Sequence, residues 1–453
     1  MGKRMLSMLL VLALGSSLLV TAAFAEGNTE NTPAAEQPQE LEPLTETAGD
    51  SQSAGEAVVS APEEQATIGA YNPELTVPQP DQVGHLSYAN LETRVRENNL
   101  TVKMLEETIA SIDVQDFDEM KESLRQRLNS IAKLQYLVIT TPKEYLEGTE
   151  LEGLTYSSLQ STYNSLQETF DDLKDGKIQA DAAAAIRQLE NAQDQLVMGA
   201  ETLYVSLLEL GAKRDSVQRT VTALNRTVEE MELRYSMGQI SALQLQQVKS
   251  GRAQAQSGLE TLKMNLDNYT AQLESMIGAE ITGELTLGTL PAVPEEKLAD
   301  MDYEKDLTAA KESSYELFAA QRDLEDAKET YDDARGKTAQ NSYNRKSAEH
   351  TWEAAQYTYQ AAVQSYELKF RTVFNAVADQ RQILQAAETA LSLQQDTYKS
   401  MELKYQQGTI SKNALLDAQD DLTDAQDTVD TAKRNLFTAW RNYQWAVEKG
   451  ILN

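Results

Sequence analysis

Few residues of this chain are of the types that commonly act in catalysis or bind metals, and these few lie far apart in the sequence. The 453 residues include no cysteine and two histidines, His85 and His350. The sequence also has no glycine-rich loop of the kind that cradles phosphates and no strand–turn–helix motif that exposes a nucleophilic serine. We therefore predict no catalytic residue, no metal site, no cofactor and no enzymatic activity.

Neighbouring carboxylates are the remaining candidates for acid–base chemistry or metal binding. Each pair is consecutive within a stretch of helical composition. Side chains of consecutive helical residues point about 100° apart, so the two carboxylates diverge. We interpret them as parts of solvated faces. The pairs are Asp171 and Asp172, Asp332 and Asp333, and Asp420 and Asp421.

A group of aromatic residues between positions 352 and 374 could form a strip that stacks on a ligand. Their spacing follows the faces of a helix, which favours packing inside a helical bundle instead. The residues are Trp352, Tyr357, Tyr359, Tyr366, Phe370 and Phe374.

A short string with a glycine near its centre occurs twice. Residues 231–241 are MELRYSMGQIS and residues 401–411 are MELKYQQGTIS, with seven of eleven positions identical. The glycine can take the left-handed conformation that ends a helix. Three residues later a serine can cap the next helix. We predict that each string is the turn of a helical hairpin, with Ile240 or Ile410 packed inward, and that the two copies arose by internal duplication.

The first 25 residues predict export. Lys3 and Arg4 precede an apolar run that ends in Ala23 and Ala25, an A-x-A arrangement. This is the pattern of a secretory signal peptide cleaved after Ala25. A retained membrane anchor is the alternative, but basic stop-transfer residues do not follow the run. No cysteine follows it either, which excludes a lipid-modified cysteine.

Residues 26–86 have the composition of a linker. They contain twelve acidic residues, no lysine or arginine, and seven of the ten prolines. Such a segment buries too little apolar surface to offset its ordering entropy, so we predict a disordered tether. Binding of a basic partner or of cations is the alternative. The whole chain has a net charge of −31, which disfavours nucleic acid as a partner because phosphates are bound by clusters of lysine and arginine.

Two long stretches have the periodicity of packed helices. Apolar residues recur at spacings of three and four, with polar residues between them. After Pro294 there is no proline and only three glycines, which predicts long helices, one of them from about Ser342 to Gln406 and roughly 95 Å long. The apolar positions are Leu245, Val248, Ala255, Leu259, Leu262, Leu266, Tyr269, Leu273 and Met276, and Leu415, Ala418, Leu422, Ala425, Val429, Ala432, Leu436, Ala439 and Tyr443.

The two halves share an order of segments but differ in length. The segment that begins at Tyr88 resembles the one that begins at Tyr303. From there to the turn tyrosine the first half has 147 residues and the second 102, so the first half has 45 extra residues. We place these near 136–177, as an irregular insertion with one small helix. The predicted parts are a signal peptide (1–25), a linker (26–86), a first helical repeat (87–290) and a second (291–453).

The duplicated turn, the string LLDAQ after the second turn and the terminal NYQWAVEKGIL resemble the TolC family of outer-membrane efflux proteins, over about residues 87–453. The resemblance implies an all-α fold of long antiparallel coiled-coil hairpins in two tandem TolC-like repeats. It also implies a homo-oligomer, a trimeric tube, whose turns dock on a membrane-fusion adaptor that belongs to an inner-membrane pump.

By position in the motif, the resemblance assigns partner docking to the turns and a duct-lining acid to the helix after the second turn. The family commonly has an aspartate six residues after each turn glycine, but Gln244 and Ala414 stand there in this chain. This sequence therefore only partly matches the charged ring that would gate the duct. The docking residues are Tyr235, Gly238, Ile240, Ser241, Tyr405, Gly408, Ile410 and Ser411, and the duct-lining acid is Asp417.

The resemblance further implies two membrane strands in each half, and this chain has no room for them. A membrane strand needs about nine to eleven residues that alternate between apolar and polar. In the second half, the break at residues 335–341 (RGKTAQN) is too short and does not alternate. In the first half, YLVITT offers one short strand. We therefore predict TolC-like helices that lack the membrane β-barrel strands of the family.

Two functions remain open from the sequence. The first is a component of an efflux or secretion system, an extracytoplasmic helical duct or adaptor-docking rod. The alternative is a coiled-coil spacer of the cell envelope that transports nothing. For either function, we expect the protein to be exported across the cytoplasmic membrane. The resemblance implies a location in the outer membrane or periplasm. In a cell with one membrane, the expected location is the extracellular face of that membrane.

Overall fold

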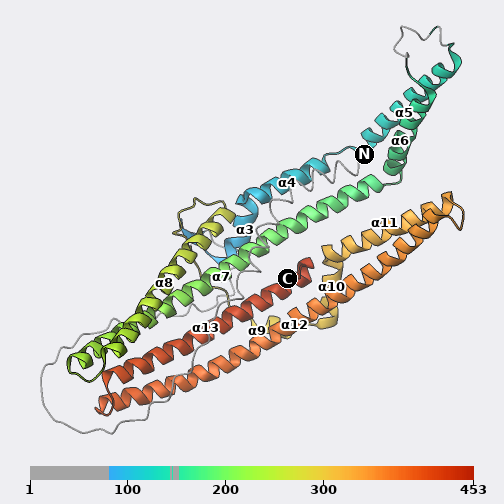
Figure 1. Ribbon diagram of the computed structural model, residues 1–453. Coiled ribbons are helices and arrows are strands. Elements are labelled where there is room, and N and C mark those ends of the chain that lie inside the picture. Colours follow the sequence, from blue (N-terminus) through green and yellow to red (C-terminus); the bar gives the residue numbers. More distant parts are fainter. Residues whose placement is uncertain (1–80, 143–144, 146–152, 453) are drawn as a thin grey trace. The chain divides into compact units, whose positions relative to one another are not determined.

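The computed structural model describes residues 81–142, 145 and 153–452 (Figure 1). These residues belong to one unit of the chain, Gly69–Asn453, and they are almost entirely helical, which confirms the predicted all-α class. The predicted signal peptide lies outside the described residues. So do residues 26–80 of the predicted linker and residues 143–144 and 146–152 of the predicted insertion.

Two long helical hairpins dominate the described fold, one from each half. In the first, α7 (Lys177–Ser236) packs against α8 (Ala242–Met276), and in the second, α12 (Tyr343–Gln406) packs against α13 (Lys412–Lys449). The predicted helix from about Ser342 to Gln406 is confirmed by α12. The apolar seams explain the pairing, since Leu259 and Leu273 of α8 and Val429 and Leu436 of α13 are buried.

Each half begins with two short helices separated by one extended residue. The first half has α3 (Tyr88–Asn98) and α4 (Leu100–Asp113), and the second has α10 (Tyr303–Ser313) and α11 (Tyr315–Lys337), after the short α9 (Glu295–Ala299). The separating residue caps the second helix in both halves. Asn99 accepts a hydrogen bond from the Thr101 amide at 2.8 Å, and Ser314 accepts one from the Leu317 amide at 3.3 Å. The duplication therefore includes the breaks as well as the turns.

The last helix of each half ends against the break of the same half. Gly278, just after α8, and Gly450, at the end of α13, both have left-handed backbones, with φ of 64° and 66°. A Cβ atom on Gly278 would lie 2.6 Å from the Asn98 carbonyl oxygen, and one on Gly450 would lie 2.3 Å from Cα of Ser314. We call these two contacts the junctions. Only glycine permits this backbone conformation together with this approach.

The end of the predicted linker is part of the fold, which corrects the predicted boundary at residue 86. β1 (His85–Leu86) pairs in parallel with β2 (Thr286–Leu287), and the Leu86 side chain is fully buried. Asp81 accepts a hydrogen bond from the Ser87 amide at 3.1 Å. The linker composition hid this contact, because the partner of the strand lies about 200 residues away in the sequence.

The extra residues of the first half form a helical hairpin, not an irregular insertion with one small helix. α5 (Phe117–Thr140) packs against α6 (Tyr156–Lys174), so the insertion begins well before residue 136. Asp116 caps α5 and Thr155 caps α6. Glycines and Pro142 near the middle of the segment suggested irregular structure, but they lie between the two helices.

Each half has an apolar core around one buried tyrosine of its long helix. In the first half the Tyr204 hydroxyl donates to the carbonyl of Gly288 at 2.8 Å. In the second half the Tyr366 hydroxyl donates to the carbonyl of Ala310 at 2.9 Å. Both rings are fully buried, so a hydroxyl without a partner would destabilise the core. Tyr204 thus fixes the segment after β2 to α7, and Tyr366 fixes α10 to α12.

Candidate functional site

The first turn has the geometry that its sequence predicts. Gly238 is left-handed, with φ of 72°, and its amide donates to the Tyr235 carbonyl at 2.9 Å to close α7. Ser241 then caps α8 by accepting from the Gln244 amide at 3.3 Å. In return the Gln244 side chain accepts from the Ser241 amide at 2.9 Å, which completes a capping box. Gln244 therefore has a structural role at this turn.

The second turn repeats this geometry without the reciprocal bond. Gly408 has φ of 72°, and its amide donates to the Tyr405 carbonyl at 2.8 Å. Ser411 accepts from the Ala414 amide at 3.2 Å. Ala414 has no side-chain acceptor to return the bond. The prediction that both strings are hairpin turns is confirmed, and Ile240 and Ile410 are half-buried in them.

Both turns expose large apolar side chains. A Cβ atom added to Gly238 or to Gly408 would meet no atom within 4 Å, so the space beside each turn glycine is open. Exposed apolar groups at the end of a hairpin are typical of a surface that binds a partner. The exposed fractions lie between 39% and 68% for Leu233, Tyr235, Met237, Leu243, Leu403 and Tyr405.

Polar contacts between α7 and α13 hold the two turns next to each other (Figure 1). Nearest the turns, the Asn413 amide nitrogen donates to Glu230 at 3.3 Å. Further from the turns, Arg226 and Asp420 form an ion pair at 2.5 Å. These contacts join residues far apart in the sequence, so they fix the relative position of the two hairpins.

The same line of contacts continues away from the turns. Arg219 forms ion pairs with Asp427 and, at 3.3 Å, with Asp424. Arg219 and Arg226 are one heptad apart, and so are Asp420 and Asp427. Charges with this spacing beside an apolar seam commonly pair between helices. The interpretation of Asp420 as part of a solvated face is therefore corrected, because it faces Arg226 across the two repeats.

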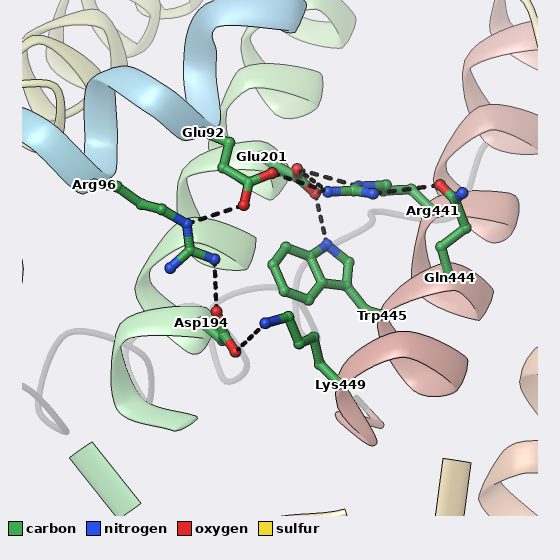
Figure 2. Close-up of polar contacts among 8 residues, drawn as sticks. All are labelled: Glu92, Arg96, Asp194, Glu201, Arg441, Gln444, Trp445 and Lys449. Atoms are coloured by element: carbon green, nitrogen blue, oxygen red, sulfur yellow. Dashed lines mark hydrogen bonds and ion pairs between the residues drawn. The ribbon is translucent and has the colours of Figure 1, made fainter. Parts of the chain in front are cut away.

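A buried ion pair joins α7 and α13 far from the turns (Figure 2). Both carboxylate oxygens of Glu201 accept from Arg441, at distances between 2.8 and 3.1 Å. The indole nitrogen of Trp445 donates to Glu201 at 2.7 Å. The Glu201 residue is only 5% exposed. A carboxylate in this position is stable only because several charged or polar donors surround it.

A second carboxylate extends this network to α3. Asp194 of α7 pairs with Arg96 of α3 at 2.6 Å and with Lys449 of α13 at 3.2 Å. Figure 2 shows both cations directed at the Asp194 side chain. We call the contacts of Glu201 and Asp194 the clamp. It joins three helices and both repeats, and it could not be predicted from local sequence because its partners are up to about 250 residues apart.

The Glu201 carboxylate shifts the pKa of two neighbouring groups, Arg441 and Tyr88. Burial opposes the charge on Arg441, but hydrogen bonding to Glu201 and the negative charge of Glu201 outweigh this and raise the pKa of Arg441. Burial and the charge of Glu201 raise the pKa of the Tyr88 hydroxyl far above its usual value. Arg441 is therefore charged and Tyr88 neutral near neutral pH.

Asp417 lies on α13 and is exposed, with the buried Ala418 next to it. The role of Asp417 as a duct-lining acid stays a prediction. Of the aromatic strip, Tyr366 and Phe370 are buried in the second core, as expected for packing, and Trp352 stacks on Tyr331 with ring centroids 5.2 Å apart. Tyr357 differs, because it is 72% exposed.

Neither a membrane span nor a metal centre is found in the described part of the chain. Within residues 81–142 and 153–452, every helix is too short or too polar to cross a lipid bilayer. In the same ranges, histidine, aspartate and glutamate side chains do not gather in the threes that a metal ion needs.

No protein-family model matches the chain, and no curated protein matches it. It is similar to solved structures. A membrane protein from Pseudomonas aeruginosa is 14% identical, with 79% of this chain and 89% of that chain covered and a TM-score of 0.47. The outer membrane protein VceC from Vibrio cholerae is 14% identical, with 80% and 95% covered and a TM-score of 0.41. The MtrE outer membrane channel of Neisseria gonorrhoeae is 12% identical, with 80% and 88% covered and a TM-score of 0.41.

Proposed function

We propose that the chain is an extracytoplasmic helical component of an efflux or secretion system, and that its two turns dock on a membrane-fusion adaptor protein. The observation that carries this proposal is the pair of turns. One comes from each repeat, both have the same glycine and serine geometry, and contacts such as Glu230 to Asn413 hold them together. A partner therefore meets two similar apolar ends at once.

The resemblance of the repeats to the TolC family extends the proposal. It suggests a homo-oligomeric duct, a trimer in that family, in which the exposed Asp417 lines the lumen and an inner-membrane pump lies beyond the adaptor. The chain would act in the cell envelope and have no catalytic activity. The docking site would then consist of Tyr235, Gly238, Ile240, Ser241, Tyr405, Gly408, Ile410 and Ser411.

Partner capture tests the docking site. The variant Met237→Ser/Leu243→Ser removes two exposed apolar side chains at the first turn. Its matched control is Leu100→Ser/Met104→Ser, which removes the same two residue types from an exposed face of α4. Each tagged chain is purified from crosslinked envelopes of the source cell, and the captured proteins are identified by mass spectrometry. We expect an adaptor with the wild type and the control, and at least tenfold less with the turn variant. Equal capture by all three would show that the turns do not dock.

Electron microscopy tests the duct. Purified chain viewed in negative stain should form particles with a central opening. Single copies without an opening would support the alternative function, a coiled-coil spacer.

A further inference from the structure

The polar contacts between α7 and α13 are interrupted midway along the two helices. Glu201 of the clamp marks one end of the interruption (Figure 2), and the ion pair of Arg219 with Asp427 marks the other. These ends are about 18 residues apart on α7, or roughly 27 Å. Among the described residues, hydrogen bonds and ion pairs join α7 to α13 at both ends of this interval but not within it.

A cavity of about 650 Å³ lies along this interval. Residues between 209 and 216 of α7 line one side, and residues between 424 and 435 of α13 line the other. Ile383 of α12 completes the lining. Small-molecule sites in proteins commonly have volumes of about 300–1,000 Å³. The cavity therefore has room for a small organic ligand that contacts both repeats.

Arg434 of α13 lines the cavity without an anionic partner. One of its terminal nitrogens donates to the Thr431 hydroxyl at 2.9 Å, and its Nε is buried without a hydrogen-bond partner. The side chain forms no ion pair with a described carboxylate, although the chain has 71 acidic residues and only 40 basic ones. A guanidinium group binds a carboxylate, sulfonate or phosphate through parallel hydrogen bonds. Arg434 thus has donors available for an anion in the cavity.

Lys213 supplies a second cation from the other repeat. It lines the same cavity from α7, and within the described part of the chain it too forms no ion pair. Two cations that line one cavity repel each other, and an anionic group between them is attracted by both. Lys213 and Arg434 together make an anion site to which each repeat contributes one charge.

Three carboxylates at the cavity limit how much negative charge a ligand can carry. Asp424 and Asp427 share Arg219 as their ion-pair partner. Glu209 is exposed and lines the cavity on the α7 side. A second negative group on the ligand would be repelled by these carboxylates. The lining therefore favours a ligand with one negative charge over a ligand with several.

Ile383 gives the cavity an apolar wall. Its side chain is 49% exposed, and the small residues Ala212 and Ala432 leave room beside it. Burying an exposed isoleucine under an apolar group is favourable because it removes apolar surface from water. A ligand that fits the lining has an apolar part as well as an anionic group.

We infer that the cavity between α7 and α13 binds a small amphipathic monoanion, with its anionic group between Arg434 and Lys213 and its apolar part on Ile383. This site is separate from the two turns, and it goes beyond the proposed function. Because the ligand contacts α7 and α13, it bridges the two repeats where their own polar contacts are interrupted.

A pair of fluorescent probes tests the inference on the purified chain. Anilinonaphthalene sulfonate is a monoanion with apolar rings, and phenylnaphthylamine has the same rings without the sulfonate. We expect the sulfonate probe to bind saturably at one site per chain. Its affinity should exceed that of the neutral probe by about tenfold, because charge-assisted hydrogen bonds hold the sulfonate.

The variant Lys213→Gln/Arg434→Gln removes both cations from the cavity. Its matched control is Arg214→Gln/Lys433→Gln, which removes one arginine and one lysine from adjacent exposed positions that do not line the cavity. We expect the first variant to bind the sulfonate probe about tenfold more weakly and the neutral probe as the wild type does. The control should bind both probes as the wild type does. Circular dichroism confirms that each variant has wild-type helix content.

A further variant tests the apolar wall. Ile383→Ser should weaken the binding of both probes, whereas Leu393→Ser should not, because Leu393 is exposed on the same helix but lies outside the cavity.

Three results would overturn the inference. One is the absence of saturable binding of the sulfonate probe to the wild type. Another is an equal loss of affinity in the cation variant and its control, and the third is unchanged binding by Ile383→Ser. These measurements use no envelope partner, so they can fail while adaptor capture at the turns succeeds, and the reverse.

Discussion

The turn glycines and the junction glycines have almost the same backbone but opposite surroundings. Gly238 and Gly408 have φ of 72°, and Gly278 and Gly450 have φ of 64° and 66°. Beside the turn glycines the space is open, whereas the junction glycines lie against the backbone of another helix. One end of each repeat is therefore closed by packing, and the other is left free.

This difference separates stability from binding. At the junctions, each glycine allows two chain segments to touch, so the fold depends on it. At the turns, glycine serves only to reverse the chain, and the apolar residues around it remain exposed. We expect changes at the junctions to unfold the chain and changes at the turns to affect its partners.

The largest expected effect is that of Gly450→Ala. The new methyl group would lie 2.3 Å from backbone atoms of Ser314, and alanine disfavours a positive φ by about 1–2 kcal/mol. Together with overpacking, the free energy of unfolding should fall by about 2–5 kcal/mol, measured by urea denaturation. A loss below about 1 kcal/mol would show that the junction is not closed.

The clamp allows the same comparison between a buried contact and an exposed one, with charged residues in place of glycines. Glu201→Gln removes the main charge that neutralises the half-buried Arg441 and leaves it only Glu92, 3.7 Å away, as an anionic partner. We expect a loss of about 2–3 kcal/mol, because breaking a buried pair costs more than the pair contributes. Glu230→Gln, next to the turns, serves as control and should cost less than about 0.5 kcal/mol. Equal losses would mean that the clamp is no more important than an exposed pair.

Gly408→Ala should have a smaller effect than its junction counterpart. Its methyl group meets no atom, so only the positive φ opposes it, at about 1 kcal/mol. The thermal midpoint should fall by a few degrees while helix content at 25 °C is unchanged. A loss as large as that of Gly450→Ala would remove the distinction between open turns and closed junctions.

The smallest effect is a dependence on pH at the first junction. Burial raises the pKa of Glu274, but hydrogen bonds from the Gly283 and Thr282 amides and the Thr282 hydroxyl outweigh it, so the pKa is lowered. A carboxyl group with a lowered folded pKa stabilises the fold above its unfolded value of about 4.5, and this contribution is lost as the pH falls through the folded pKa.

Titration of stability against pH measures that contribution. Between pH 7 and the acid limit of folding, Glu274→Gln should lose less unfolding free energy than the wild type. Glu402→Gln, which changes an exposed carboxyl near the second turn, should follow the wild type. If Glu274→Gln has the wild-type pH dependence, the buried carboxylate does not stabilise the junction.

Local sequence was sufficient wherever a few neighbouring residues decide the structure. The two turns, the caps at Ser241 and Ser411 and the span of α12 could be predicted, because helix ends depend on contacts within about four residues. The insertion shows the limit of such reasoning. Its glycines and Pro142 indicated irregular structure, yet the periodic residues on both sides form α5 and α6.

Contacts between distant residues could not be predicted in the same way. Nothing near Glu201 in the sequence indicates that Arg441 and Trp445 surround it, and Asp420 looks like any exposed carboxylate until Arg226 is seen beside it. The heptad spacing of Arg219 and Arg226 and of Asp420 and Asp427 was a usable signal. It indicated charged flanks of a seam but not which helices pair.

The sequence by itself determined that the chain is helical and duplicated, and where its hairpins turn, because hydrogen bonds and side-chain packing within a few residues set these features. Only the tertiary structure decided that α7 faces α13, that Leu86 belongs to the fold and that Arg441 and Trp445 surround Glu201. Each of these depends on which surfaces remain after distant segments have packed, and that is a property of the whole chain.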